Sequence, residues 1–225
     1  MEKLKPFFKV VTWDGRGQGG SPGWPEIYPL AMQVEDLKSV VGKLSLPRDQ
    51  RVCVLGLSNG GRVALEFARR YSSFVSHLII ADTYGELTPL LKLKLQSWLK
   101  ASEIGGAKLR FDVATPWVFG ESFVAEYPEL IQSYRAHAET IGPEVTASLI
   151  QGAMDSKIEL EKISTKTLVL VGEEDLLTPF ALHLAMVKRM SDAKLEIIKG
   201  GHASLLEFPE SIDEFVLPFL KEDLI

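Results

Sequence analysis

The chain has 225 residues, 46% of them hydrophobic, which is enough to bury one substantial core without requiring two full domains. Its net charge of -5, without any long basic run, argues against a surface for nucleic acid or anionic membrane and favours a small or neutral partner. No apolar stretch is as long as a membrane span, and the start MEKLKP lacks the apolar region of a signal peptide. The chain has a single cysteine, so it cannot form an intrachain disulfide. Together these features favour the cytoplasm.

Strand and helix patterns alternate along most of the chain. Helical apolar spacing predicts helices over 30–44, 61–71 and 179–190. Short apolar runs rich in β-branched residues predict strands over 7–13, 51–55, 76–81, 167–171 and 194–198. Such alternation is typical of an α/β protein, with a mainly parallel sheet covered by helices on both faces. Cys53, inside the second predicted strand, is expected to be a small buried side chain.

One interval breaks this alternation. Residues 87–157 contain helix-like pieces such as LLKLKLQSWLKAS and PELIQSYRAHAETIG but no convincing strand. We interpret this interval as a helical cap inserted into a core formed by 1–86 and 158–225. The cap is rich in aromatic residues that can form an apolar lid over a site, with ordinary packing of cap on core as the alternative for each. The candidates for substrate contact are Trp117, Phe119 and Phe123.

The glycine-rich turn GRGQGG, from Gly15 to Gly20, fits the G-x-G-x-x-G spacing of a dinucleotide-binding turn. That site needs a helix directly behind the glycines to hold the pyrophosphate, whereas SPGWP follows here and cannot propagate a helix. The acidic residue expected on a second strand about 20 residues further on is also missing. Nucleotide binding at this turn is therefore a minor alternative.

The stretch VCVLGLSNGGRVALEFARRY contains G-x-S-x-G in the strand-turn-helix context that the motif requires. The small flanking residues let the chain bend sharply, so that Ser58 projects its hydroxyl above the sheet at a helix N-terminus. A serine hydroxyl is a poor nucleophile at neutral pH and needs a histidine base that is oriented by a carboxylate. Ser58 is therefore the candidate nucleophile.

A base and an acid are found in loops that follow later strands. Of the four histidines, only His202 lies in a glycine-flanked loop directly after a strand, where α/β sheets gather catalytic groups. For the carboxylate, Asp175 in VGEEDLLTP is preferred over Asp82 in LIIADT. The order Ser58, Asp175, His202 is the serine, acid, histidine order of one large fold. Asp82 is expected to be a structural residue at a strand end.

Five motifs in order, WDGRGQGGS, GLSNGG, RYSSFVSHLIIADT, VGEEDLLTP and GGHASLLEFPE, give the chain a resemblance to the α/β-hydrolase family. The similarity covers nearly the whole chain and is strongest to compact members with a helical cap, such as enol-lactonase-like and esterase-like enzymes. The first motif resembles the family's D-x-R-G-x-G-x-S turn, which follows the fourth strand of the fold. In that interpretation the glycines shape a tight turn near the site and bind no phosphate.

The resemblance also implies that the N-terminus is truncated. If 7–13 is the fourth strand, the usual first three strands are absent, together with the His-Gly loop that supplies one of two backbone donors to the oxyanion hole. Only the N–H of Asn59, the residue after the nucleophile, can be carried over. The place beside 51–55 would then be filled by direct pairing with 7–13, by a strand from a second copy, or by an N-terminal piece outside this sequence. An unpaired edge there favours self-association.

Serine at the nucleophile position implies acyl chemistry in this family. We expect a serine hydrolase acting on a small carboxylic ester, lactone or related acyl substrate through Ser58, His202 and Asp175, with no metal and no organic cofactor. The alternative is a hydrolase-fold binding protein that is catalytically weak or inactive because the oxyanion loop is missing.

Overall fold

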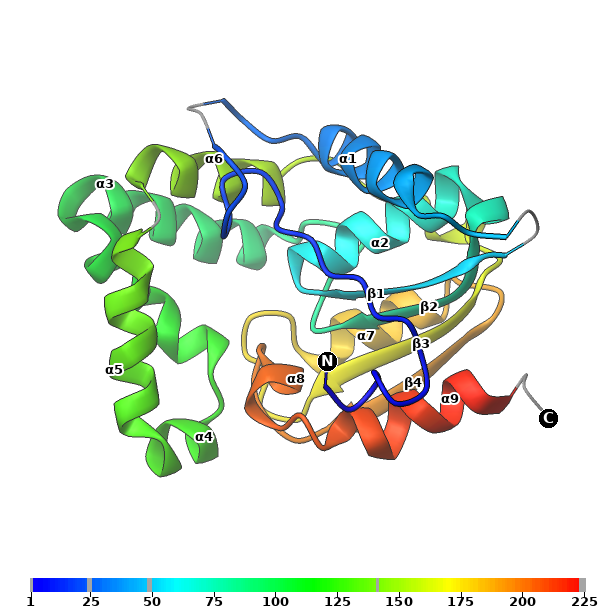
Figure 1. Cartoon of the computed structure of the whole chain (residues 1–225). Coiled ribbons are helices and arrows are strands. Elements are labelled where there is room, and N and C mark those ends of the chain that lie inside the picture. Colours follow the sequence, from blue (N-terminus) through cyan, green and yellow to red (C-terminus); the bar gives the residue numbers. More distant parts are fainter. Residues whose placement is uncertain (1, 24–25, 48–49, 141, 223–225) are drawn as a thin grey trace.

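The computed structural model describes residues 2–23, 26–47, 50–140 and 142–222. Its centre is a four-stranded parallel sheet in the order β1 (Val52–Leu57), β2 (Val75–Ala81), β3 (Lys166–Gly172) and β4 (Ala193–Ile198) (Figure 1). The two central strands, VSHLIIA and KTLVLVG, are mostly apolar and are buried over most of their length, as expected for parallel strands covered on both faces. Because all four strands run in the same direction, their carboxyl ends meet at one edge of the sheet.

Helices cover both faces of this sheet, as the α/β pattern predicts. One face packs against α1 (Leu30–Lys43), α2 (Asn59–Arg70) and α7 (Phe180–Val187), which contribute to one buried apolar cluster with β1, β2 and β3. The other face packs against the π-helix η4 (Ile212–Val216) and α9 (Leu217–Lys221). Short 3-10 helices, η1 (Ser72–Phe74) and η3 (Leu160–Lys162), precede β2 and β3.

Between β2 and β3 the chain forms the helices that the sequence predicts as a cap. They are α3 (Pro89–Val118), α4 (Glu121–Glu126), α5 (Pro128–His137), the 3-10 turn η2 (Ala138–Thr140) and α6 (Pro143–Ala153), and they lie to one side of the sheet (Figure 1). α3 is interrupted at Gly105 and Gly106, where Gly106 has φ 69° and the helical conformation is lost. Although α3 has 30 residues, no helix in the described ranges is long and apolar enough to cross a membrane.

A buried arginine fixes the point where the chain leaves the cap. Arg62, on α2, is fully buried and donates hydrogen bonds to main-chain carbonyl oxygens of Ala153 (2.7 Å), Asp155 and Ser156 (2.7 Å). Its guanidinium also lies 4.9 Å from the ring centroid of Tyr84. Because this charge is satisfied by carbonyl groups of one short segment, that segment is held against α2.

The predicted strand over 7–13 is wrong. Residues 2–7 form turns and 9–15 have no regular structure, and no backbone hydrogen bond joins the described part of this segment to β1. Phe8 and Val10 instead pack against the apolar cluster on the α9 side of the sheet, while Trp13 remains 41% exposed. A β-branched run becomes a strand only where a neighbouring strand completes its hydrogen bonds, and this segment has none among the described residues. Direct pairing with β1 is thereby excluded.

The expectation of a buried Cys53 is also wrong, because its side chain is exposed. β1 is an edge strand that pairs with β2 alone in the described structure, so its outer edge carries unpaired backbone groups. A strand-like sequence predicts burial correctly only if both neighbours are present.

Candidate active site

Ser58 lies on a sharp turn between β1 and α2. Its backbone has φ 53° and ψ -122°, a strained conformation for a residue other than glycine. The neighbouring glycines make the turn sterically feasible, because a Cβ at Gly56 would lie 2.2 Å from the carbonyl oxygen of Gly60. A Cβ at Gly61 would lie 2.7 Å from Thr83 on the next strand's loop. The glycine spacing that identified Ser58 therefore has a direct structural cause.

The structure brings the three residues of the predicted triad together at the carboxyl edge of the sheet. Nε2 of His202 lies 2.7 Å from Oγ of Ser58, and Nδ1 of His202 lies 3.1 Å from Oδ2 of Asp175. Asp175 is in the loop after β3, and His202 is in the loop after β4. Both side chains are almost fully buried, so water competes little for these hydrogen bonds.

The carboxylate of Asp175 is held on both oxygens. Oδ1 accepts hydrogen bonds from the backbone N–H groups of Leu177 (2.9 Å) and Thr178 (2.8 Å), and Oδ2 accepts one from the Thr178 hydroxyl (2.7 Å). Burial alone would raise the pKa of Asp175, but hydrogen bonds from His202 and Thr178 and the charge of His202 outweigh it and lower the pKa. Asp175 is therefore ionised at neutral pH and suited to orient an imidazole. The role of Thr178 was not predicted, although a threonine before a helix-starting proline is a recognisable signal.

Asp82, the competing acid, lies in a different environment. Its Oδ1 accepts from the backbone N–H of Gly172 (2.8 Å), and its Oδ2 accepts from the backbone N–H (3.1 Å) and the hydroxyl of Ser204. It is fully buried, and burial raises the pKa of its carboxyl to about 7. No hydrogen bond joins it to a ring nitrogen of His202 among those described. Asp82 thus ties the ends of β2 and β3 to the segment that follows His202.

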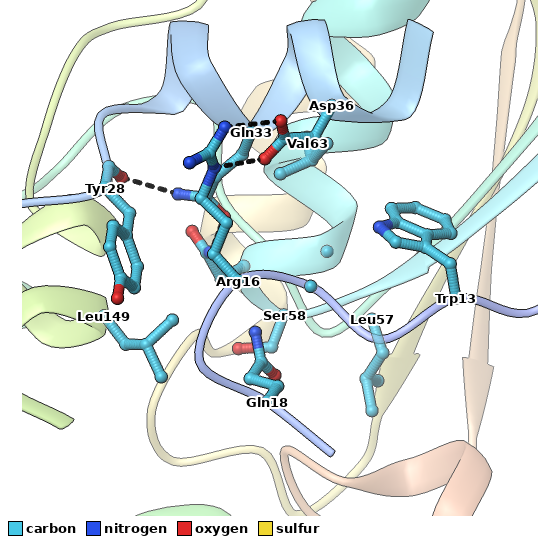
Figure 2. A pocket seen from close by; sticks show the side chains of 13 residues that line it. Trp13, Arg16, Gln18, Tyr28, Gln33, Asp36, Leu57, Ser58, Val63 and Leu149 are labelled. Carbon is cyan, nitrogen blue, oxygen red and sulfur yellow. Dashed lines mark hydrogen bonds and ion pairs between the residues drawn. The ribbon is translucent and has the colours of Figure 1, made fainter. Parts of the chain in front are cut away.

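A cavity of about 380 Å³ opens beside Ser58 (Figure 2). Its apolar wall includes Trp13, Leu57, Val63 and Leu149. Its polar wall includes Gln18, Gln33, Asn59 and the ion pair between Arg16 and Asp36, in which Nη2 and Oδ1 are 2.7 Å apart. Because Asp36 neutralises Arg16, this wall offers mainly uncharged hydrogen-bonding groups to a ligand.

The predicted oxyanion donor, Asn59, is the first residue of α2. Its backbone N–H makes no hydrogen bond to another described residue, as is usual for the first turn of a helix. Its side-chain amide donates to Oε1 of Gln33 (2.9 Å), and Nε2 of Gln33 donates to the carbonyl oxygen of Tyr28 (2.7 Å). The side chain of Asn59 therefore supports the cavity wall and leaves the backbone N–H free to face a substrate.

The glycine-rich turn closes upon itself beside this cavity. The carboxylate of Asp14 accepts a hydrogen bond from the N–H of Gly20 (2.8 Å), and the Ser21 hydroxyl donates to the carbonyl oxygen of Asp14 (2.7 Å). Gly17 and Gly19 have φ values of 68° and 52°, which favour glycine. These contacts are typical of a tight turn at the rim of the site. The backbone N–H of Gly20, which a phosphate would need as a donor, is already bonded to Asp14.

The aromatic residues predicted to contact substrate do not line the cavity at Ser58. Trp117 packs in the cap with Lys94, whose Nζ lies 4.5 Å from its ring centroid. Phe119 and Phe123 stack on each other with ring centroids 5.8 Å apart, and Phe123 is buried. These residues were candidates because they are aromatic and lie in the cap, but the sequence did not show which surface they would meet. In this structure they pack within and beneath the cap.

Among the described residues, no group of three or more histidine, cysteine, aspartate or glutamate side chains is arranged to hold a metal ion. The remaining histidines have other surroundings. Nε2 of His183 accepts a hydrogen bond from the N–H of Thr83 (3.0 Å), and burial lowers the pKa of His183 to about 4. His77 packs edge-on against Phe219.

Comparisons with known proteins agree with this architecture. The family model described as serine aminopeptidase, S33, matches residues 5–208. The putative carbamate hydrolase RutD of Rhizobium rhizogenes is 25% identical, over 98% of this chain and 86% of its own. The poly(3-hydroxyalkanoate) depolymerase of Ectopseudomonas oleovorans is 28% identical, over 99% of this chain and 78% of its own.

Solved structures show the same fold. A thermophilic esterase from Thermogutta terrifontis superposes with a TM-score of 0.87 at 27% identity, covering 98% of this chain and 82% of the esterase. The enol-lactonase of Burkholderia xenovorans superposes with a TM-score of 0.86 at 21% identity, covering 98% of this chain and 84% of the lactonase. Since the family model spans most of the sequence and the folds agree, this chain belongs to the α/β-hydrolase family of serine-type hydrolases.

Proposed function

We propose that this protein hydrolyses small carboxylic esters, lactones or related acyl substrates through Ser58, His202 and Asp175. The observation that carries the proposal is the 2.7 Å contact between Nε2 of His202 and Oγ of Ser58 on a strained turn, with Asp175 on the other ring nitrogen. A nucleophile, a base and a group that orients the base are the minimum set for acyl transfer. An esterase and an enol-lactonase among the similar structures support this substrate class.

The geometry accounts for each proton transfer of this reaction. Oγ of Ser58 attacks the substrate carbonyl carbon while Nε2 of His202 takes the hydroxyl proton, and Asp175 stabilises the resulting imidazolium. The imidazolium then gives this proton to the departing alkoxide, which leaves as the alcohol. Water, deprotonated by the same nitrogen, then attacks the acyl-enzyme. The imidazolium returns this proton to Oγ of Ser58 as the acyl–oxygen bond breaks, which releases the carboxylic acid and restores the free enzyme.

The negative oxygen of the tetrahedral intermediate needs donors other than the triad. The N–H of Asn59 is one donor, and we propose the side-chain amide of Gln18 as a second. Gln18 lines the cavity together with Ser58, and its amide nitrogen points toward the Ser58 side chain in Figure 2. Its side chain makes no hydrogen bond within the described structure, so the amide is free to reach an oxyanion. Side-chain amides serve as oxyanion donors in other hydrolases.

Replacing Gln18 with alanine is expected to lower kcat for an activated ester by about 100-fold, because one oxyanion donor is typically worth 100- to 1,000-fold. KM should change much less, since this hydrogen bond forms mainly in the transition state. The measurement is steady-state hydrolysis of a p-nitrophenyl ester. Gln132→Ala, at an exposed position on α5, is the matched control and should keep wild-type kinetics. A Gln18→Ala enzyme with unchanged kcat would leave Asn59 as the only donor.

The unmodified protein is expected to cleave short p-nitrophenyl esters measurably and ordinary alkyl esters poorly. A flexible side-chain amide stabilises the oxyanion less than a fixed backbone N–H does. The rate of hydrolysis should be reduced least for substrates with good leaving groups, because their transition states need less stabilisation. The substrate series is best combined with intact-mass measurement after incubation with a fluorophosphonate, which should add one label per chain at Ser58. A folded protein that takes up no label would instead support the catalytically inactive binding protein. Turnover of alkyl esters at about 10 per second, the usual enzyme median, would show that the oxyanion site is complete.

A further inference from the structure

A second cavity opens on the cap. It has a volume of about 240 Å³ and is lined by residues of the second half of α3, of α5 and of the turn that follows α5. None of its lining residues belongs to the cavity at Ser58. An engineered apolar cavity of about 150 Å³ is sufficient for benzene, so this space accommodates an apolar group of that size or larger.

Most of the wall of this cavity is apolar, and its aromatic rings are held in place by contacts with one another. The ring of Phe119 stacks with that of Tyr134 at a centroid distance of 5.8 Å and lies 6.3 Å from that of Phe111. Ala114 and Val118 complete the surface between these rings. The hydroxyl of Thr115 is engaged with the carbonyl oxygen of Phe111 at 2.8 Å. The wall therefore favours a flat or aliphatic apolar group.

Arg110 is the residue of this wall that always carries a charge, beside the polar side chains of Thr115, Tyr134 and His137. Its Nε is buried without a hydrogen-bond partner, and no ion pair is formed by its guanidinium in the described structure. The nearby carboxylates are committed elsewhere, since Asp112 forms two hydrogen bonds with Arg135 (2.6 and 2.7 Å) and Glu139 pairs with Lys108 (2.9 Å). An arginine stays protonated at physiological pH, and the charge of this half-buried guanidinium can be balanced by solvent or by a bound anion.

We propose that the cap cavity binds a carboxylate with an apolar chain of medium length, its head group on Arg110 and its chain between the aromatic rings. The planar guanidinium matches a carboxylate with two parallel hydrogen bonds. A carboxylate carries one negative charge, which matches the one positive charge of Arg110. The wall also adjoins the catalytic loop, because the carbonyl oxygen of Val118 accepts from the N–H of Ala203 (3.1 Å).

The proposal is tested by calorimetric titration of the full chain, in which the affinity for octanoate is compared with the affinity for octanol. The two ligands share a chain, but only octanoate carries the charge that Arg110 would bind. Octanoate is expected to bind at one site and at least about tenfold more tightly than octanol. In Arg110→Met, which keeps an unbranched apolar side chain, octanoate affinity should fall by a similar factor. Arg51→Met, at an exposed position on the core, is the matched control and should bind octanoate as the wild type does.

Fluorophosphonate-treated protein separates this site from the cavity at the nucleophile, because a label on Ser58 occupies that cavity. The labelled protein should bind octanoate with the affinity of the untreated protein, because the two cavities share no residue, and loss of octanoate binding on labelling would overturn the proposal. Equal affinity of the unmodified protein for octanoate and octanol would overturn the proposal even if Arg110→Met failed to fold. Undiminished octanoate binding by a folded Arg110→Met protein would overturn it as well.

Discussion

Ser58→Ala is expected to lower kcat for a p-nitrophenyl ester by about four orders of magnitude or more. Loss of the nucleophile removes the acyl-enzyme route and leaves only the contribution of oxyanion donors and substrate binding. The backbone of the turn should be unaffected, because its shape is set by Gly56 and Gly61 against their neighbours. The measurement is kcat together with intact mass after fluorophosphonate treatment, in which the variant should take up no label.

The control for this variant is Ser73→Ala, at an exposed position in η1, which should retain wild-type turnover and labelling. Thermal unfolding should place both variants close to the wild type. If Ser58→Ala keeps most of the activity and the label, another residue is the nucleophile and the proposed function must be rebuilt around it.

Asp175→Asn is expected to lower kcat by about 10,000-fold with little change in stability. An amide at this position can donate to Nδ1 of His202, which would stabilise the tautomer that cannot accept the Ser58 proton. The backbone N–H groups of Leu177 and Thr178 can still donate to the remaining amide oxygen, so the loop should keep its shape. The measurements are kcat at neutral pH and unfolding by urea.

Asp82→Asn is the matched comparison and should show the opposite pattern. The amide N–H groups of Asn would face the backbone N–H of Gly172 or of Ser204, so that donor meets donor and a hydrogen bond is lost. The free energy of unfolding should fall by about 1–3 kcal/mol. The value of kcat should stay near that of the wild type. Full stability with lost activity in Asp82→Asn would move the acid role away from Asp175.

The pH dependence of stability provides a second test of Asp82. Burial raises its pKa from 3.8 to about 7 in the folded state. The unfolded chain therefore loses this proton at lower pH than the folded chain does, and the resulting stability decreases as the pH rises from about 4 to 7. Asp82→Asn should lack this decrease, which urea unfolding at pH 5 and pH 7 would detect by comparison with the wild type.

The sheet and the triad geometry could be predicted from the sequence because their signals are local. Each described strand is a short apolar run bounded by a turn, and Ser58, Asp175 and His202 each follow such a run directly. Parallel strands bring these loops to one edge whatever the intervening chain does. That is why residues separated by 144 positions, Ser58 and His202, could be placed together without a model of the cap.

Other features of the fold and the site could not be predicted, because they depend on contacts between residues that are distant in the sequence. The run over 7–13 has strand composition, but a strand also requires a neighbour, and the sequence does not state whether one is present. Phe119 could be recognised as an aromatic residue of the cap, but the sequence did not show that it would face Tyr134. The unpaired state of Arg110 follows from Asp112 being taken by Arg135, which depends on how α3 meets α5.

The attachment of Arg62 determines where the cap can move. If the cap moved away at the segment that follows α6, the buried hydrogen bonds from Arg62 to Ala153 and Ser156 would break. The charged guanidinium of Arg62 would then be left unpaired, which costs free energy. The break at Gly105 and Gly106 has no such attachment and already lacks helical conformation. The far side of the break is attached to the core as well, because the N–H of Ala203 donates to the carbonyl oxygen of Val118 (3.1 Å) and the N–H of Gly120 donates to Glu207 (3.1 Å). The cap is therefore held at two places, by α2 behind Ser58 and by the loop that carries His202. A change in the cap would reach the nucleophile and the base through separate contacts.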